Sequence, residues 1–148
     1  MLVFKRESFS SIQEELPPLI REHAKELSPH KGKYEPILAK AYNLLEWDGH
    51  LVVVTARDEG KLVGYCAFIL APSLHYRGVL NAEIDCFFLQ KKYRKGLAGI
   101  RLLKSGEEAC KESGATHIVQ KCKVCQDLSP ILERMGYEKI EYVFLKEV

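Results

Sequence analysis

Four cations fall within five consecutive positions at the start of KKYRKGLAGIRLL, residues 91–103, before the segment turns to glycine, alanine and leucine. This change in composition predicts that a helix begins after the basic run. Backbone N–H groups at a helix N-terminus have no intrahelical partner, the helix dipole favours anions, and glycines let a ligand approach closely. The segment therefore predicts a phosphate site, and the alternative is a solvated basic turn.

Two known phosphate motifs do not fit this segment. The chain has no G-x-x-x-x-G-K-[ST] sequence, and the spacing of Gly96 and Gly99 is not that of G-x-G-x-x-G. A nucleic-acid interface is also disfavoured, because the formal net charge of the chain is only +2 and Tyr93 is the one aromatic residue within the basic run. What remains is a pyrophosphate-sized site on a helix N-terminus.

Two carboxylates lie on the segment just before the basic run. In VLNAEIDCFFL, residues 79–89, the even positions from Leu80 to Phe88 are apolar, which predicts a strand with Glu83 and Asp85 on its opposite face, about 7 Å apart. A primary amine has a pKa near 10 and is mostly protonated at pH 7, and a carboxylate can remove that proton. The pair is compatible with a general base and with a solvated strand face.

The surrounding elements form a predicted α/β pattern. Helices are expected from a capping box at 11–14, after Pro17 and Pro18, over 35–47, from the basic loop to Glu112, and from Ser129 to Gly136. Strands are expected at 2–5, 51–57, 62–70, 79–89, 116–124 and, as one or two strands, 137–148. The helix after the basic loop connects two strands, so those two strands should be parallel and the sheet mixed.

The segment FLQKKYRKGLAGIRLL, residues 88–103, resembles the coenzyme A signature of the GNAT N-acetyltransferase family, a Tyr-Arg approach followed by R/Q-x-x-G-x-G/A. Arg94 aligns with its first position and Gly99 with its last, while Leu97 stands where the first motif glycine belongs and Gly96 is displaced by one. The order of elements and the closing LERMGY at 132–137 are also similar to the family. HYR at 75–77 and the A..D..F spacing of 82–88 resemble small phage-encoded members.

The resemblance implies a single GNAT-like domain over residues 1–148 that transfers an acetyl group from acetyl-CoA to a primary amine. It implies a fold of the α/β class (α+β in some schemes), a mixed, mostly antiparallel sheet with a central parallel βαβ unit and helices on both faces. The positions that it implies for acetyl-CoA binding are Phe87, Leu89, Arg94, Lys95, Gly96, Leu97, Ala98, Gly99 and Ile100.

The resemblance also assigns catalytic roles. Glu83 matches the base glutamate of some members and Asp85 the strand aspartate of phage-like members, and we place Glu83 slightly ahead. Leu132 stands where many relatives carry a tyrosine that protonates the leaving thiolate, but a thiol with a pKa near 8.5 leaves without a strong acid. His75 and Tyr76 precede the carboxylate strand and are compatible with an acceptor pocket or an ordinary turn.

The composition limits the class of protein, the use of its cysteines and its location. A 47% apolar and 28% charged chain is that of a globular protein, and five cysteines do not suggest a disulfide framework. Cys122 and Cys125 form a C-x-x-C without a second ligand pair, so we expect structural thiols and no metal. Without a signal-like or membrane-spanning run, a cytoplasmic location is expected.

Two alternatives remain open. The first is a GNAT-shaped interaction protein that has lost catalysis, and the second is a nucleic-acid binder that uses residues 91–95. The acceptor, a small molecule or a protein amine, is not specified by the sequence, which is compatible with a homodimer but fixes no oligomeric state.

Overall fold

The computed structural model describes residues 1–27 and 39–148, which form a five-stranded sheet in the order β1-β2-β3-β4-β5. Neighbouring strands are antiparallel except β4 and β5, which are parallel, so the predicted mixed sheet is confirmed. The strands are β1 (Leu2–Arg6), β2 (Leu51–Asp58), β3 (Lys61–Pro72), β4 (Leu80–Leu89) and β5 (His117–Val119). The α-helices are α1 (Phe9–Ile12), α2 (Leu16–Leu27), α3 (Ala39–Trp47), α4 (Ala98–Glu112) and α5 (Ser129–Arg134).

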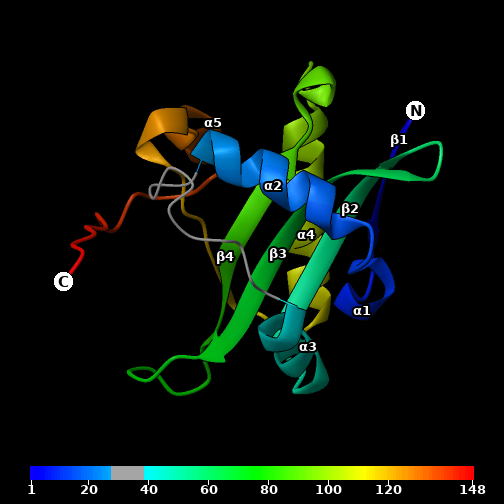
Figure 1. Ribbon diagram of the computed structural model, residues 1–148. Coiled ribbons are helices and arrows are strands. Elements are labelled where there is room, and N and C mark those ends of the chain that lie inside the picture. The colour runs from blue at the N-terminus through cyan, green and yellow to red at the C-terminus, as the bar shows by residue number, and fades with distance from the viewer. Residues whose placement is uncertain (28–38) are drawn as a thin grey trace.

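The sheet is covered on both faces, as the resemblance implies. α2 crosses one face of the sheet and α4 lies behind the other (Figure 1). On the α4 side, Leu102 and Cys110 are fully buried against strand residues such as Phe68. α4 lies so close to β3 that a Cβ at Gly106 would come within 2.6 Å of the Phe68 ring. On the α1–α3 side, a second buried cluster includes Ile12 and Phe88.

A β-bulge interrupts the predicted alternation of β4. Cys86 pairs with Ala67 and Ile84 with Phe68, so Asp85 is an extra residue without a partner across the ladder. Ala82 and Ile84 therefore pack on the α4 side, whereas Cys86 and Phe88 pack on the α1–α3 side. The expectation that all even positions from 80 to 88 share one face is wrong beyond Ile84, because the inserted residue reverses the facing of those that follow.

The first helix begins earlier than expected. Ser8, and not Ser11, is its N-cap, and the Ser8 side chain accepts a hydrogen bond from the Ser11 backbone N–H at 3.3 Å. The helix after Pro17 and Pro18 is confirmed as α2, because prolines are tolerated in a first turn whose N–H groups have no helical partner. α3 ends at Trp47, which confirms the end of the helix predicted over 35–47. The first four residues of that predicted helix, 35–38, lie outside the described part of the chain.

The strands predicted near the C-terminus, one over 116–124 and one or two over 137–148, are largely absent. Only residues 117–119 of the expected strand 116–124 pair with β4, and residues 138–148 form neither strand nor helix. We call residues 138–148 the C-terminal tail. Every residue of this tail is exposed. A strand sequence needs a partner ladder to satisfy its backbone, and the tail has no partner strand within the described residues.

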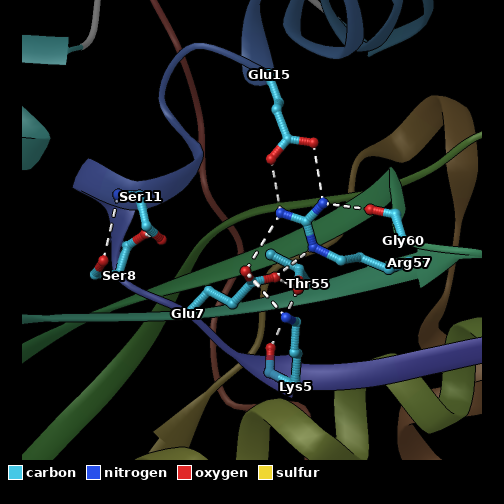
Figure 2. Close-up of polar contacts among 8 residues, drawn as sticks. All are labelled: Lys5, Glu7, Ser8, Ser11, Glu15, Thr55, Arg57 and Gly60. Atoms are coloured by element: carbon cyan, nitrogen blue, oxygen red, sulfur yellow. Dashed lines mark hydrogen bonds and ion pairs between the residues drawn. The ribbon is translucent and has the colours of Figure 1, made fainter.

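A polar network joins the N-terminal segment to the β2–β3 hairpin (Figure 2). The Arg57 guanidinium, whose side chain is 11% exposed, donates to Glu7 Oε2 at 2.7 Å, to Glu15 Oε1 at 2.8 Å and to the Gly60 carbonyl at 2.7 Å. Burial works against ionisation of Glu7, but the hydrogen bonds from Arg57 and Thr55 outweigh it and lower the pKa of this carboxyl. The network therefore fixes the position of α1 and α2 over the sheet.

Replacing Glu7 by Gln is expected to lower the free energy of unfolding at pH 7 by about 1–3 kcal/mol, because Arg57 loses a charged partner. Since the folded pKa of Glu7 lies below its ordinary value of 4.5, its stabilising contribution is complete above that pH and is lost as the pH falls through the folded pKa. As the pH falls below 4.5, the free energy of unfolding of the variant should therefore decrease less than that of the wild type. Urea unfolding across this range checks both effects.

The matched control is Glu14→Gln, the same chemical change on an exposed neighbouring residue. It is expected to leave both the stability at pH 7 and its pH dependence near those of the wild type. Equal effects of the two substitutions would show that the Arg57 network does not carry the stability.

Candidate functional site

The basic loop between β4 and α4 is fixed by contacts that its own residues make. The Tyr93 hydroxyl donates to Asp58 Oδ2 at 2.9 Å, at the end of β2. The Arg94 side chain donates from Nε to the Leu89 carbonyl at 2.6 Å and forms an ion pair with Glu26 of α2 at 2.8 Å. The structure thus places the Arg94 guanidinium against the fold, where it holds the loop.

The other cations of the loop face outward. Lys91, Lys92 and Lys95 are exposed, and the Lys92 ammonium lies 4.7 Å from the centre of the Tyr93 ring. None of the three has an ion-pair partner among the described residues. The loop therefore presents exposed positive charge beside the start of α4.

The N-terminus of α4 is open. Gly96 adopts a φ of 59°, a left-handed conformation that glycine takes without steric cost and that turns the chain into the helix. The N-cap is Leu97, whose side chain has no hydrogen-bond acceptor, and the first turn contains no acidic residue. Within the described residues, the N–H groups of Ala98, Gly99 and Ile100 consequently have no acceptor. The arrangement is that of an anion site.

The strands beside this helix diverge. β4 and β5 pair only over Asn81–Glu83 and His117–Val119. Beyond Glu83, β4 continues to Leu89 with β3 on one side and no described strand on the other. The Phe87 ring lies next to the α4 N-terminus, since a Cβ built at Gly99 would come 3.5 Å from it. The unpaired edge of β4 thus leads from Asp85 to the open helix end.

A groove of about 360 Å³ continues from the start of α4 to α5. It has apolar walls and two cationic side chains, and is lined by Leu97, Ile100, Lys104, Ile131, Arg134 and Met135. Leu97 and Ile100 belong to the predicted phosphate segment, so the groove extends the anion site. The sequence analysis assigned only Leu97 and Ile100 to the site and missed the other four lining residues. The signal available for them was the pair of cations, Lys104 and Arg134, on the two neighbouring helices.

The two predicted carboxylates have different partners. Glu83 accepts a hydrogen bond from the Lys121 ammonium, which neutralises its charge across the β4–β5 junction. Asp85, the bulge residue, accepts a hydrogen bond from the Tyr42 hydroxyl of α3. Burial, followed by the nearby Cys86 and Asp85, raises the pKa of Tyr42 far above its ordinary value, so the phenol remains a donor. The Glu83 carboxylate therefore has a cationic partner, whereas the partner of the Asp85 carboxylate is a neutral phenol.

A cluster of rings from α2, β3 and β4 occupies the same side of the sheet as Asp85. His23 Nδ1 lies 2.9 Å from the Tyr65 hydroxyl, and its ring stacks on Phe88 with centroids 4.9 Å apart. Burial lowers the pKa of His23, so the imidazole is neutral near pH 7. These contacts give His23 a structural role between α2 and the sheet.

His75 and Tyr76 lie at the other end of β4 from the basic loop. Their backbone N–H groups both donate to Ser73 Oγ at 3.2 Å, which closes the β3–β4 turn, and the Tyr76 side chain is 70% exposed. Along a strand of ten residues the two ends are about 30 Å apart. The structure thus brings the phosphate segment and Asp85 to one edge but leaves His75 and Tyr76 away from the helix end.

The remaining features are few. Among the described residues no group of three or more His, Cys, Asp or Glu side chains can hold a metal, and Cys122 and Cys125 are free thiols. In the part of the chain that the structure describes, no helix is long and apolar enough to cross a membrane.

The fold is that of solved acetyltransferases. A putative acetyl transferase from Pyrococcus furiosus superposes with a TM-score of 0.73 at 22% identity, covering 100% of both chains. An aminoglycoside acetyltransferase from an uncultured soil metagenomic sample, in complex with sisomicin, gives 0.76 at 14% identity over 99% of this chain and 96% of that one. AAC(6')-Iy in complex with a bisubstrate analog, CoA-S-monomethyl-acetylneamine, gives 0.72 at 13% identity over 100% and 98%.

At these identities the superpositions show a shared fold and nothing more about activity. No curated protein matches the sequence. Residues 13–137 match the profile of the acetyltransferase (GNAT) family, and this span contains α2, α3, the strands β2 to β5, the basic loop, α4 and α5. The chain belongs to the acetyltransferase (GNAT) family.

Proposed function

We propose that this protein, acting as one domain, transfers an acetyl group from acetyl-CoA to a primary amine. The observation that carries the proposal is the uncapped N-terminus of α4 beside the diverging β4 edge. Free N–H groups and the helix dipole suit a pyrophosphate. The unpaired backbone of β4 offers hydrogen bonds to the amide-containing arm of coenzyme A. The chain belongs to a family of acetyltransferases. Because the acetyl donor of such enzymes is acetyl-CoA, we take acetyl-CoA as the ligand that fits this site best.

The groove between α4 and α5 suits the nucleotide end of the same ligand. Its apolar walls, Ile100 and Ile131 among them, fit a base, and Lys104 and Arg134 supply charge for a ribose phosphate. The exposed Lys92 and Lys95 add to the positive field on the approach. We assign Arg94 a positioning role through Glu26 and Leu89, while its backbone remains part of the loop.

We place Asp85 ahead of Glu83 as the general base. The Lys121 ammonium already occupies Glu83 and competes with an incoming amine for that carboxylate. The Asp85 carboxylate is held in place by the neutral Tyr42 hydroxyl and lies where β4 no longer pairs with β5. It accepts the proton that the attacking amine must lose.

The leaving thiolate needs no tyrosine. Leu132, at the position that many relatives use for an acid, is buried in α5 and carries no proton donor. The neighbouring Tyr137 hydroxyl is engaged with Glu107 at 2.5 Å, and burial raises the pKa of this phenol. A thiol whose pKa is near 8.5 leaves as the thiolate and is protonated by water.

The rival functions are less well supported. An inactive interaction protein gives no reason for an open helix end, a diverging strand edge and an uncompensated carboxylate at one place. A nucleic-acid binder would be expected to place stacking aromatic side chains among its cations, yet Tyr93 is held by Asp58 with its ring facing Lys92.

The test is release of free thiol from acetyl-CoA in the presence of a panel of amines that includes aminoglycosides, polyamines and peptides with free N-termini. We expect acetyl-CoA to bind, and at least one amine to release thiol in proportion to acetylated product found by mass spectrometry. Binding without turnover for any acceptor would favour the interaction protein, and binding of an oligonucleotide without acetyl-CoA would favour the nucleic-acid binder.

A further inference from the structure

One lysine of this chain lies beside the place where an acceptor amine is expected. The Lys121 ammonium donates a hydrogen bond to the Glu83 carboxylate, and the Lys121 side chain is 49% exposed. Val119, which pairs with Glu83, is the last residue of β5, so Lys121 lies just beyond the point where β4 and β5 stop pairing. A primary amine in contact with a carboxylate is therefore present where the two strands diverge.

Lys121 is also near Asp85. Glu83 and Asp85 are two residues apart on β4, which places them roughly 7 Å apart along the strand. Because we assign Asp85 to take a proton from the attacking amine, the thioester carbon of bound acetyl-CoA has to lie within reach of Asp85. The lysine ammonium is carried on a flexible four-carbon stem, so Lys121 can turn from Glu83 towards that carbon.

The other ion-paired lysines lie elsewhere in the fold. Among the described residues these are Lys5, paired with Glu7, and Lys111, paired with Glu108. Lys5 belongs to β1, which is separated from β4 by two strands. Lys111 lies near the C-terminal end of α4, about 20 Å from the N-terminus of that helix. Lys121 therefore differs from both in its position beside the β4 edge.

We propose that the protein acetylates its own Lys121, an inference that rests on the proposed acetyl transfer from acetyl-CoA. The Lys121 ammonium gives one proton to the Glu83 carboxylate and becomes a neutral amine, whose lone pair attacks the thioester carbon. The new N–C bond forms, the C–S bond breaks and coenzyme A leaves as the thiolate. The second proton of the nitrogen passes to water, and the product is an amide.

The reaction is favoured because both reactants are held in one molecule. An amine on the protein does not have to be captured from solution, so the entropy cost of bringing it to the thioester is already met. Acetylation removes the positive charge of Lys121. The Glu83 carboxylate then loses its cationic partner and, with Asp85, presents two negative charges to an incoming cationic amine.

The experiment is incubation of the full chain with acetyl-CoA and no added amine, followed by mass spectrometry of its proteolytic peptides over time. The protein as isolated is measured first, so that acetyl groups gained during expression are counted. We expect one acetyl group per chain, on Lys121, at a rate that does not depend on protein concentration. Lys5 is the matched internal control, because it is also paired with a glutamate and is 51% exposed. It should react at least about 100-fold more slowly.

Glu83→Gln tests the assigned proton acceptor. At pH 7 it should slow the acetylation of Lys121 by about 10²–10⁴-fold, and by less near pH 10, where the lysine loses its proton unaided. Glu14→Gln, which removes an exposed carboxylate elsewhere, should leave the rate unchanged. A wild-type rate in Glu83→Gln would overturn the proposed role of this carboxylate.

A parallel assay of thiol release with the amine panel separates this inference from the proposed function. If an added amine is acetylated while Lys121 stays unmodified, or if Lys121 reacts no faster than Lys5, self-acetylation is wrong and the proposed function stands. A rate that rises with protein concentration would also overturn the inference, because one copy would then be modifying another. If acetyl-CoA does not bind at all, both proposals are wrong.

Discussion

Replacing Asp85 by Asn is expected to lower kcat by about 10²–10⁴ with the best acceptor, while the affinity for acetyl-CoA stays within about twofold of the wild type. Asn has the same shape and still accepts the Tyr42 hydroxyl, so the bulge of β4 is preserved. It cannot take a proton from the amine. The affinity should hold because Asp85 belongs to neither the α4 N-terminus nor the α4–α5 groove.

Glu83→Gln is the matched control, since it removes the same charge two residues away on the same strand. It should cost less than about tenfold in kcat, because the Lys121 ammonium already occupies the Glu83 carboxylate in the wild type. Steady-state kinetics at several pH values complete the test. The acceptor amine has a pKa near 10, so the loss in Asp85→Asn should shrink at high pH, where more of the amine is already neutral. A larger effect of Glu83→Gln than of Asp85→Asn would return the role of base to Glu83.

The phosphate segment could be predicted from sequence because its signals are local. A basic run, a glycine and the apolar spacing of a helix lie within a dozen residues, and the structure places the start of α4 and the left-handed Gly96 inside that segment. The two strands of the β2–β3 hairpin were predicted for the same reason. Their turn, Glu59 and Gly60, has positive φ at both residues, as tight hairpins require.

The bulge at Asp85 has no comparable signal. Beyond it β4 is covered on both faces, with Phe88 packed under α2 and Leu89 under α4, so apolar residues occur on both sides. Periodicity cannot reveal a reversal of facing where both faces are apolar. For that reason the sequence analysis placed Cys86 and Phe88 on the same face as Ala82 and Ile84. In the structure the two pairs face opposite sides of the sheet.

The partners of the site residues could not be predicted either, because they come from distant parts of the chain. Tyr42 reaches Asp85 from α3, Glu26 reaches Arg94 from α2, and Arg134 lines the groove from α5. Such contacts depend on how the helices pack over the sheet. The C-terminal tail is a related case, since its strand propensity was evident but a strand forms only where a ladder partner exists.

Replacing Gly99 by Glu is expected to weaken acetyl-CoA binding by at least about 100-fold without unfolding the protein. Gly99 is the second residue of α4, where a carboxylate interacts favourably with the helix dipole and helix stability rises by a few tenths of a kcal/mol to about 1 kcal/mol. The same carboxylate competes for the free N–H groups that would bind a pyrophosphate and repels its charge. Hydrogen bonds to charged groups contribute about 1.5–3 kcal/mol each, so losing even two of them accounts for the expected loss.

Gly99→Ala and Gly99→Gln separate the causes. A Cβ at this position meets only the Phe87 ring, at an ordinary contact distance of 3.5 Å, so Gly99→Ala should fold and bind with at most a few-fold change. Gly99→Gln has the size of Glu without its charge, and its affinity should fall between the other two. Calorimetric titration with acetyl-CoA and thermal unfolding of all four proteins make the comparison. If Gly99→Glu binds acetyl-CoA as tightly as Gly99→Ala while its melting temperature is unchanged, the N-terminus of α4 is not where the pyrophosphate binds.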